Sequence, residues 1–255
     1  MKILTMLVLI TMFLVGVSEG TRTTVTVRVK SMDAKFIGTT MGGALVVIKD
    51  AETGEVLAKG LTMGGTGDTQ KIMVEPIRRG VPITDNTAAK YETAIDISEP
   101  KLVTIEVYAP YAQRQSMIKN TSQVWLIPGK NILGDGLIIE VAGFSVNVMT
   151  PQTHEMLKLV GGKIKVPIRA NVVMMCGCPI TPNGIWDANK YEVKAIVKHN
   201  GVLSDEIPLT FANKANTFEG TLDVTKEGSY EVIVYSFDPM SGNAGVDKTT
   251  FMVGK

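Results

Sequence analysis

The chain has 255 residues, a formal net charge of +1 and an aromatic content of 6%. A nucleic-acid-binding protein would carry lysine and arginine clustered on one face, so this near-neutral balance argues against a nucleic-acid partner, and we expect none. The few aromatic side chains also disfavour a carbohydrate-binding platform of stacked rings.

The first residues have the pattern of an export signal. Lys2 supplies a positive charge, residues 3–17 are largely apolar, and small residues follow up to Gly20. The apolar stretch is shorter than the roughly 20 residues that a membrane span needs. We therefore predict a signal peptide over residues 1–20, cleaved to give an extracytoplasmic protein that is periplasmic, on the cell surface or secreted. The alternative is an uncleaved signal, which would be the protein's contact with the membrane.

The next block, residues 21–150, has the periodicity of β-strands. Over residues 24–30, valines alternate with polar residues, the period-two pattern of a half-buried strand. Residues 44–60 predict a hairpin, because two apolar runs flank the polar turn Asp50–Glu55. Further strands are predicted at 70–75, 91–97, 102–108, 122–127, 136–141 and 143–148.

The predicted hairpin also carries a resemblance. The run Ala44–Ile48 and the segment Asp50–Ala58 that follows it resemble the transthyretin-like, carboxypeptidase-regulatory-like sandwiches. The resemblance implies a β-sandwich domain over residues 21–150. Because such domains are mostly accessory or adhesive, it implies no catalytic residues.

A second block follows Thr150-Pro151, with strand patterns at 163–175, 191–198, 203–211, 218–224, 229–237 and 248–253. Asn200-Gly201 predicts a two-residue hairpin turn of the primed type. Short strands with turn signals every 8–12 residues are typical of an immunoglobulin-like (Ig-like) sandwich. The stretch Thr221–Val232 resembles the late-strand region of bacterial Ig-like modules. The predicted fold is all-β, with two tandem antiparallel β-sandwich domains, 21–150 and 151–255, after the signal peptide.

Cys176 and Cys178 are the two cysteines of the chain, separated by Gly177. In an exported protein this pair has several interpretations. An internal disulfide would close a very small ring, which would be readily reduced and able to exchange with other thiols. The thiolates could instead bind a soft metal, or a cysteine could pair with a partner or a second copy. Inert free thiols are the remaining interpretation.

The soft-metal interpretation needs further ligands. We name Met175 and His199 as tentative ligands beside Cys176 and Cys178, because thioether, imidazole and thiolate groups bind copper or zinc. The structural interpretation makes Met175 a core residue at the end of an apolar strand and His199 an exposed residue before a turn. We expect no cofactor, with copper or zinc as the alternative.

Pro179, Trp186 and Asp187 belong to the loop that follows the cysteine pair. Two prolines and an Asn-Gly pair give this loop a defined shape. Trp186 either anchors the loop on the sandwich or offers a contact surface, and anchoring is the favoured interpretation. Because function concentrates on loops that a rigid scaffold holds, residues 176–187 are the candidate contact site.

The sequence contains no readable nucleophilic triad, phosphate loop or carboxylate pair placed in a cleft, so we expect no enzyme activity. The predicted function is that of an exported, non-catalytic accessory or interaction protein of the cell envelope. It would have a protein partner and use the Cys-Gly-Cys loop as a contact or cross-link point. The first alternative is a soft-metal (copper-like) binding or delivery protein, and the second is a thiol–disulfide exchange factor.

Overall fold

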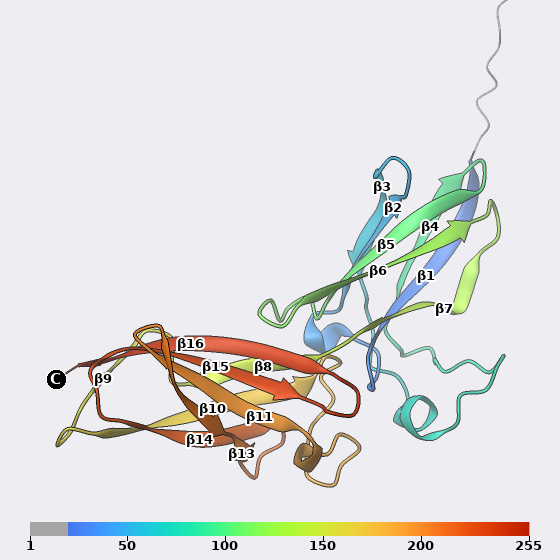
Figure 1. Ribbon diagram of the computed structural model, residues 1–255. Helices are drawn as coiled ribbons and strands as arrows, with labels where there is room; N and C mark the ends of the chain where they lie inside the picture. The colour runs from blue at the N-terminus through green and yellow to red at the C-terminus, as the bar shows by residue number, and fades with distance from the viewer. Residues whose placement is uncertain (1–19, 255) are drawn as a thin grey trace, which may run out of the picture.

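The computed structural model describes residues 20–254, so the predicted signal peptide lies outside the described residues except for Gly20. Nearly all regular structure in the described part is β-strand, which confirms the predicted all-β class. Figure 1 shows the strands in two groups, one N-terminal and one C-terminal. Within residues 20–254, no helix is long and apolar enough to cross a bilayer.

The first sandwich consists of a sheet of order β4-β1-β7 and a sheet of order β3-β2-β5-β6. Neighbouring strands are antiparallel except β1 and β7, which run parallel. Its strands are β1 (Thr21–Ser31), β2 (Leu45–Asp50), β3 (Val56–Leu61), β4 (Tyr91–Ile97), β5 (Lys101–Ala109), β6 (Ile118–Leu126) and β7 (Ile132–Val141).

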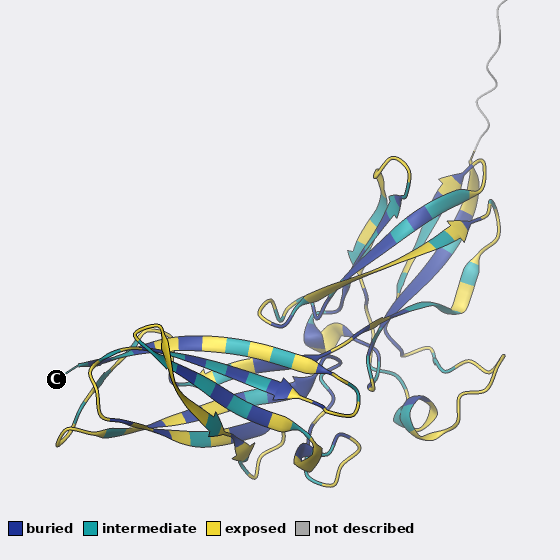
Figure 2. Ribbon diagram, viewed as in Figure 1, coloured by how far each residue is buried: buried dark blue, intermediate teal, exposed yellow. Residues whose placement is uncertain are grey.

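The period-two pattern of the sequence determines which face of each strand is buried. Val25, Val27 and Val29 on β1 are fully buried, as are Val46 and Ile48 on β2. Full burial of such an aliphatic side chain contributes about 1.5–3 kcal/mol. Figure 2 shows the same alternation of buried and exposed positions along many strands of both sandwiches.

The second sandwich consists of sheets of order β13-β14-β10-β8 and β12-β11-β15-β16-β9. Lettered along the chain, these are A-B-E-D and C′-C-F-G with a short A′ strand, which is the Ig-like arrangement. The strands are β8 (Phe144–Thr150), β9 (Glu155–Lys158), β10 (Ile164–Met174), β11 (Glu192–His199), β12 (Val202–Pro208), β13 (Thr210–Phe211), β14 (Thr217–Val224), β15 (Gly228–Phe237) and β16 (Ala244–Gly254).

Two local features agree with this arrangement. The hydroxyl of Tyr230, near the start of β15, donates a hydrogen bond to the backbone oxygen of Lys226 at 2.9 Å. Such a backward bond at the start of strand F is the tyrosine corner of Ig sandwiches. Asn200 and Gly201 have φ angles of 49° and 83°, which confirms the predicted primed turn between β11 and β12.

One predicted strand, at residues 70–75, is wrong. The segment forms a single π-helical turn, η2 (Gln70–Val74). The carboxylate of Asp68 accepts a hydrogen bond from the backbone N–H of Lys71 at 2.9 Å and so favours a turn at this point. Ile72 is buried beside Phe36, so the apolar residue that suggested a strand is used to pack the turn.

The strand that was predicted as the last one of the first sandwich, β8, belongs to the second sandwich. β8 pairs with β10 and not with a strand of the first sandwich, although it precedes the predicted boundary near residue 150. The chain therefore leaves the first sandwich after β7 and enters the second through Ala142 and Gly143. β9 has no counterpart in the predicted strands, because four residues are too few to show a clear period.

Glu106 on β5 is a buried acid held by three donors. Its carboxylate accepts hydrogen bonds from Lys119 Nζ at 2.8 Å, Lys49 Nζ at 3.0 Å and the hydroxyl of Tyr108 at 2.9 Å. Lys119 first, and then Lys49, hold the pKa of Glu106 at about 2. An unfolded glutamate has a pKa of about 4.3, so this stabilisation is present above that pH and is lost as the pH falls towards the folded value.

We expect Glu106→Gln to lower the free energy of unfolding at neutral pH, because the charge-assisted hydrogen bonds are lost. The deficit relative to wild type should shrink as the pH falls below about 4 and be small by pH 2, where wild-type Glu106 is itself half protonated. Urea unfolding across this pH range measures it, with the exposed turn residue Glu52 changed to Gln as the control. A deficit that stays constant with pH would contradict the assignment.

Candidate functional site

The two cysteines lie just after β10 and are bonded to each other. Cys176 and Cys178 form a disulfide with their Cα atoms 5.4 Å apart, and 0% and 4% of their surfaces are exposed. Of the interpretations that the sequence allows for the two cysteines, the internal disulfide is therefore confirmed. A cross-link from either sulfur to another chain is not what this structure shows. The disulfide forms a small ring in the chain directly after the end of β10.

Gly177 makes the tight turn between the two cysteines. Its φ is +81°, a left-handed conformation that favours glycine, and its N–H donates to the backbone oxygen of Met174 at 2.7 Å. A Cβ at this position would lie 3.1 Å from both Cγ and Sδ of Met41. Met41 belongs to a 3-10 turn of the first sandwich, η1 (Thr39–Met41), so the disulfide turn packs against the other sandwich.

The loop after the disulfide is closed by its own hydrogen bonds. The N–H of Thr181 donates to the backbone oxygen of Trp186 at 3.1 Å. A carboxylate oxygen of Asp187 accepts from the N–H of Asn189 at 3.0 Å and from that of Asn183 at 2.9 Å. These backbone donors, Asn189 first, lower the pKa of Asp187. Asp187, predicted as a contact residue, thus stabilises the conformation of the loop by accepting hydrogen bonds from its backbone.

Asn216 fastens the same loop to its own sandwich. Its side-chain oxygen accepts from the N–H of Ile180 at 2.7 Å, and its own N–H donates to the backbone oxygen of Ile180 at 3.0 Å. Its backbone oxygen accepts from the N–H of Val172 on β10 at 2.7 Å. Asn216 adopts a φ of +67°, a conformation that asparagine tolerates better than most residues.

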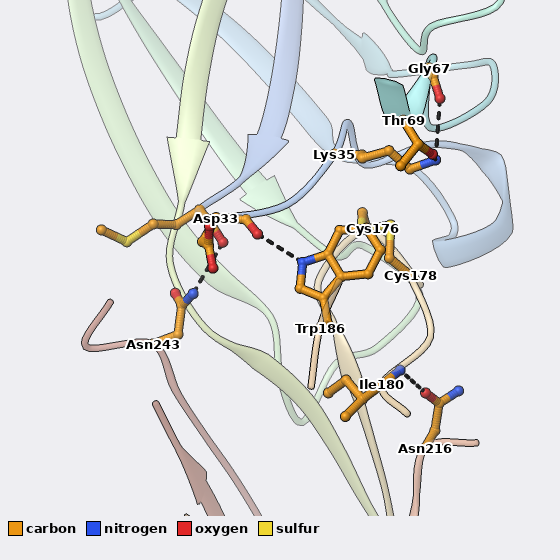
Figure 3. The surroundings of a disulfide bond; sticks show 11 residues. Asp33, Lys35, Gly67, Thr69, Cys176, Cys178, Ile180, Trp186, Asn216 and Asn243 are labelled. Carbon is orange, nitrogen blue, oxygen red and sulfur yellow. Dashed lines mark hydrogen bonds between the residues drawn. A yellow bond between two sulfur atoms is a disulfide. The ribbon is translucent and has the colours of Figure 1, made fainter. Parts of the chain in front are cut away.

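Trp186 connects the loop to the first sandwich. The indole is 5% exposed, and its Nε1 donates a hydrogen bond to the backbone oxygen of Asp33 at 2.8 Å. Asp33 lies in the turn that follows β1, and Figure 3 shows the indole between this turn and the disulfide. Trp186 does anchor the loop, as the sequence favours, but its hydrogen bond goes to the other sandwich.

Asn243 forms a second polar connection between the sandwiches. It is 0% exposed and lies in the turn between β15 and β16. Its side chain donates to the backbone oxygen of Met32 at 3.1 Å and accepts from the N–H of Gly143 at 2.6 Å. The same side chain thus contacts the turn after β1 and the passage between the sandwiches. Both connections lie within a buried apolar cluster that is continuous across the two sandwiches.

A cleft of about 550 Å³ lies beside the disulfide. Its first-sandwich side is formed by Lys35, Thr40, Thr66 and Thr69. The second-sandwich side is formed by the cysteine loop, including Pro179, which was predicted as a contact residue. In Figure 3 the Lys35 side chain and the disulfide lie on facing sides of this region. The Nζ of Lys35 donates to Thr69 Oγ1 at 2.8 Å and to the backbone oxygen of Gly67 at 3.2 Å.

The four tentative metal ligands are not brought together. The sulfurs of Cys176 and Cys178 are bonded to each other, and Met175 is buried with its methyl group packed near Gly143. His199 is at the far end of β11, stacked on Tyr230 with ring centroids 4.7 Å apart. His199 therefore lies at the opposite end of β11 from the cysteine loop, which precedes that strand. Within residues 20–254 no group of three or more His, Cys, Asp or Glu side chains could hold a metal ion.

Residues that complete the site were not found from the sequence. Lys35, Met41, Asn216 and Asn243 lie far from the cysteines along the chain. Local patterns carry no signal for such contacts. The one available hint is a run of small and polar residues around Asn216, which is typical of a turn and does not identify its partner.

The fold and this site define an all-β protein of two sandwiches connected through a disulfide-closed loop. A scan against protein-family models found no match to the sequence, and a search of curated proteins found none either. Three solved structures show low similarity, and all three TM-scores are below 0.5, so the fold description rests on the strand pairing alone.

The first solved structure is an engineered protein, a Northeast Structural Genomics Consortium target, at 11% identity and a TM-score of 0.33. The match covers 51% of this chain and 24% of that one. An ICAM-5 D1–D4 ectodomain fragment has 11% identity, coverage of 92% and 50%, and a TM-score of 0.26. A chimeric titin Z1Z2 carrying a decorin KLER peptide has 8% identity, coverage of 93% and 98%, and a TM-score of 0.25. This chain thus spans half or less of the first two.

We expect Gly177→Ala to destabilise the protein by more than Gly201→Ala. Both glycines have φ near +80°, and a left-handed alanine costs about 1 kcal/mol or more. A Cβ at Gly201 would have open space, whereas a Cβ at Gly177 would press on Met41. The difference in free energy of unfolding between the two variants therefore measures the contact with the first sandwich. Equal losses would contradict the prediction, because the Met41 side chain would then yield to the added methyl group without cost.

Proposed function

We propose that this chain is an exported, non-catalytic interaction protein of the cell envelope, in which residues 176–187 hold the two sandwiches as one unit. The observation that carries the proposal is the hydrogen bond from Trp186 to Asp33. Through this bond the loop that was predicted as a contact site binds the first sandwich. Two sandwiches in a fixed arrangement present one continuous surface to a protein partner.

The disulfide supports the extracytoplasmic location. Disulfides persist in oxidising compartments and are rare where glutathione and thioredoxin keep thiols reduced. The Cys176–Cys178 bond agrees with the export signal expected over residues 1–20. The transthyretin-like resemblance of the first sandwich, which implies an accessory or adhesive domain, agrees with the same role.

Burial of the disulfide favours a structural role over exchange. A thiolate must reach a disulfide sulfur to attack it, and Cys176 and Cys178 expose 0% and 4% of their surfaces. The soft-metal alternative needs thiolates, which the bonded sulfurs would supply only after reduction. Both alternatives remain distinguishable outcomes of the experiment below.

We expect the cysteines of the full chain to be completely oxidised in cells, because export delivers the protein to an oxidising compartment. Acid quenching followed by alkylation and a gel-shift assay measures the thiol state. The matched control lacks residues 1–20 and stays in the cytosol, where its cysteines should be reduced.

The same thiol state in both chains would contradict the proposal of export. A partly reduced steady state with mixed disulfides to other proteins would favour the exchange factor. Stoichiometric copper in the purified full chain, lost on Cys176→Ser with Cys178→Ser, would favour the soft-metal protein.

A further inference from the structure

The cleft beside the disulfide has the properties of a small-molecule site. Its volume of about 550 Å³ lies within the range of roughly 300–1,000 Å³ that is usual for such sites. It lies at the junction of two sandwiches, where ligand sites are frequent. Its walls come from loops that the disulfide, Asn216 and Trp186 hold in place, so the cleft is formed without a ligand.

One side of the cleft carries a positive charge. The ammonium of Lys35 has three donors and uses two of them, for Thr69 and Gly67. Both of these acceptors are neutral. Within residues 20–254 Lys35 forms no ion pair. Its charge is therefore uncompensated by a carboxylate, and one N–H remains for a ligand. The hydroxyls of Thr40 and Thr66 line the same cleft.

The other side of the cleft is apolar except for the hydroxyl of Thr181. It is lined by the exposed side chains of Pro179 and Ile185 and by the nearly buried disulfide and Trp186 indole, whose N–H is already used by Asp33. Ile185 is 56% exposed and lines the cleft, so its side chain is open to a bound ligand. A bound apolar chain would cover this surface and release its water.

We infer that the cleft binds a small amphiphilic monocarboxylate, with its carboxylate on Lys35 and its hydrocarbon chain against Ile185, Pro179 and Trp186. A single uncompensated cation matches a single negative charge. On the opposite side the one polar side chain is the neutral hydroxyl of Thr181, which cannot neutralise a second charged group. This site goes beyond the proposed function and does not require it.

Decanoate and decanol are the probes, because they share a hydrocarbon chain length and differ in charge. Trp186 serves as the reporter. The chain has two tryptophans, so the Trp125→Phe variant leaves Trp186 as the single emitter, and Trp125 is a 60% exposed residue of β6. We expect a saturable change in Trp186 fluorescence with decanoate below its micelle concentration. Decanol should bind about tenfold more weakly, the usual effect of losing a charge-assisted hydrogen bond.

Lys35→Met should reduce decanoate affinity to that of decanol and leave decanol affinity unchanged, while Lys35→Arg should restore the preference for decanoate. The control Lys130→Met removes an exposed lysine outside the cleft and should bind both probes as the parent does. Far-UV circular dichroism checks that each variant is folded. The inference is overturned if decanoate gives no saturable change, if both probes bind the parent equally, or if Lys130→Met loses the preference as Lys35→Met does.

Discussion

The hydrogen bond from the Trp186 indole to the backbone of Asp33 is the interaction on which the arrangement of this molecule depends. A buried indole N–H needs an acceptor, because leaving it unpaired would cost about 1–3 kcal/mol. The acceptor that it finds belongs to the other sandwich, at 2.8 Å. The loop that carries Trp186 is therefore complete only when the first sandwich is in place.

The disulfide and the loop hydrogen bonds reduce the entropy cost of this contact. Residues 176–187 are already restrained by the Cys176–Cys178 bond, by the carboxylate of Asp187 and by Asn216. Few conformations then remain to be lost when Trp186 meets Asp33. Asn243 adds a second bond at Met32, so both connections hold the turn that follows β1.

Much of the fold could be predicted from the sequence, because burial in a sandwich follows the period-two pattern of each strand. Val25, Val27 and Val29 show this for β1. The turn at Asn200-Gly201 could be predicted for a different reason, because its positive φ angles allow few residue types. The prediction failed at residues 70–75, where a turn anchored by Asp68 uses its apolar residue for local packing.

The site could be predicted only in part. The cysteine pair and Trp186 stand out by residue type, and their loop is indeed the place where the sandwiches meet. Their partners, including Met41 and Asn243, do not stand out, because such contacts join positions far apart along the chain. His199 and the cysteine loop are at opposite ends of β11, because the loop precedes this strand and His199 is its last residue.

Hydrogen exchange of the two indole N–H groups tests the central claim most directly. Trp186 is bonded across the sandwiches and 5% exposed, whereas Trp125 is 60% exposed and serves as an internal reference in the same sample. In two-dimensional ¹⁵N–¹H spectra we predict that the Trp186 indole exchanges at least about a hundredfold more slowly than that of Trp125, since opening must break the contact between the sandwiches. Equal exchange rates for the two indoles would contradict the account.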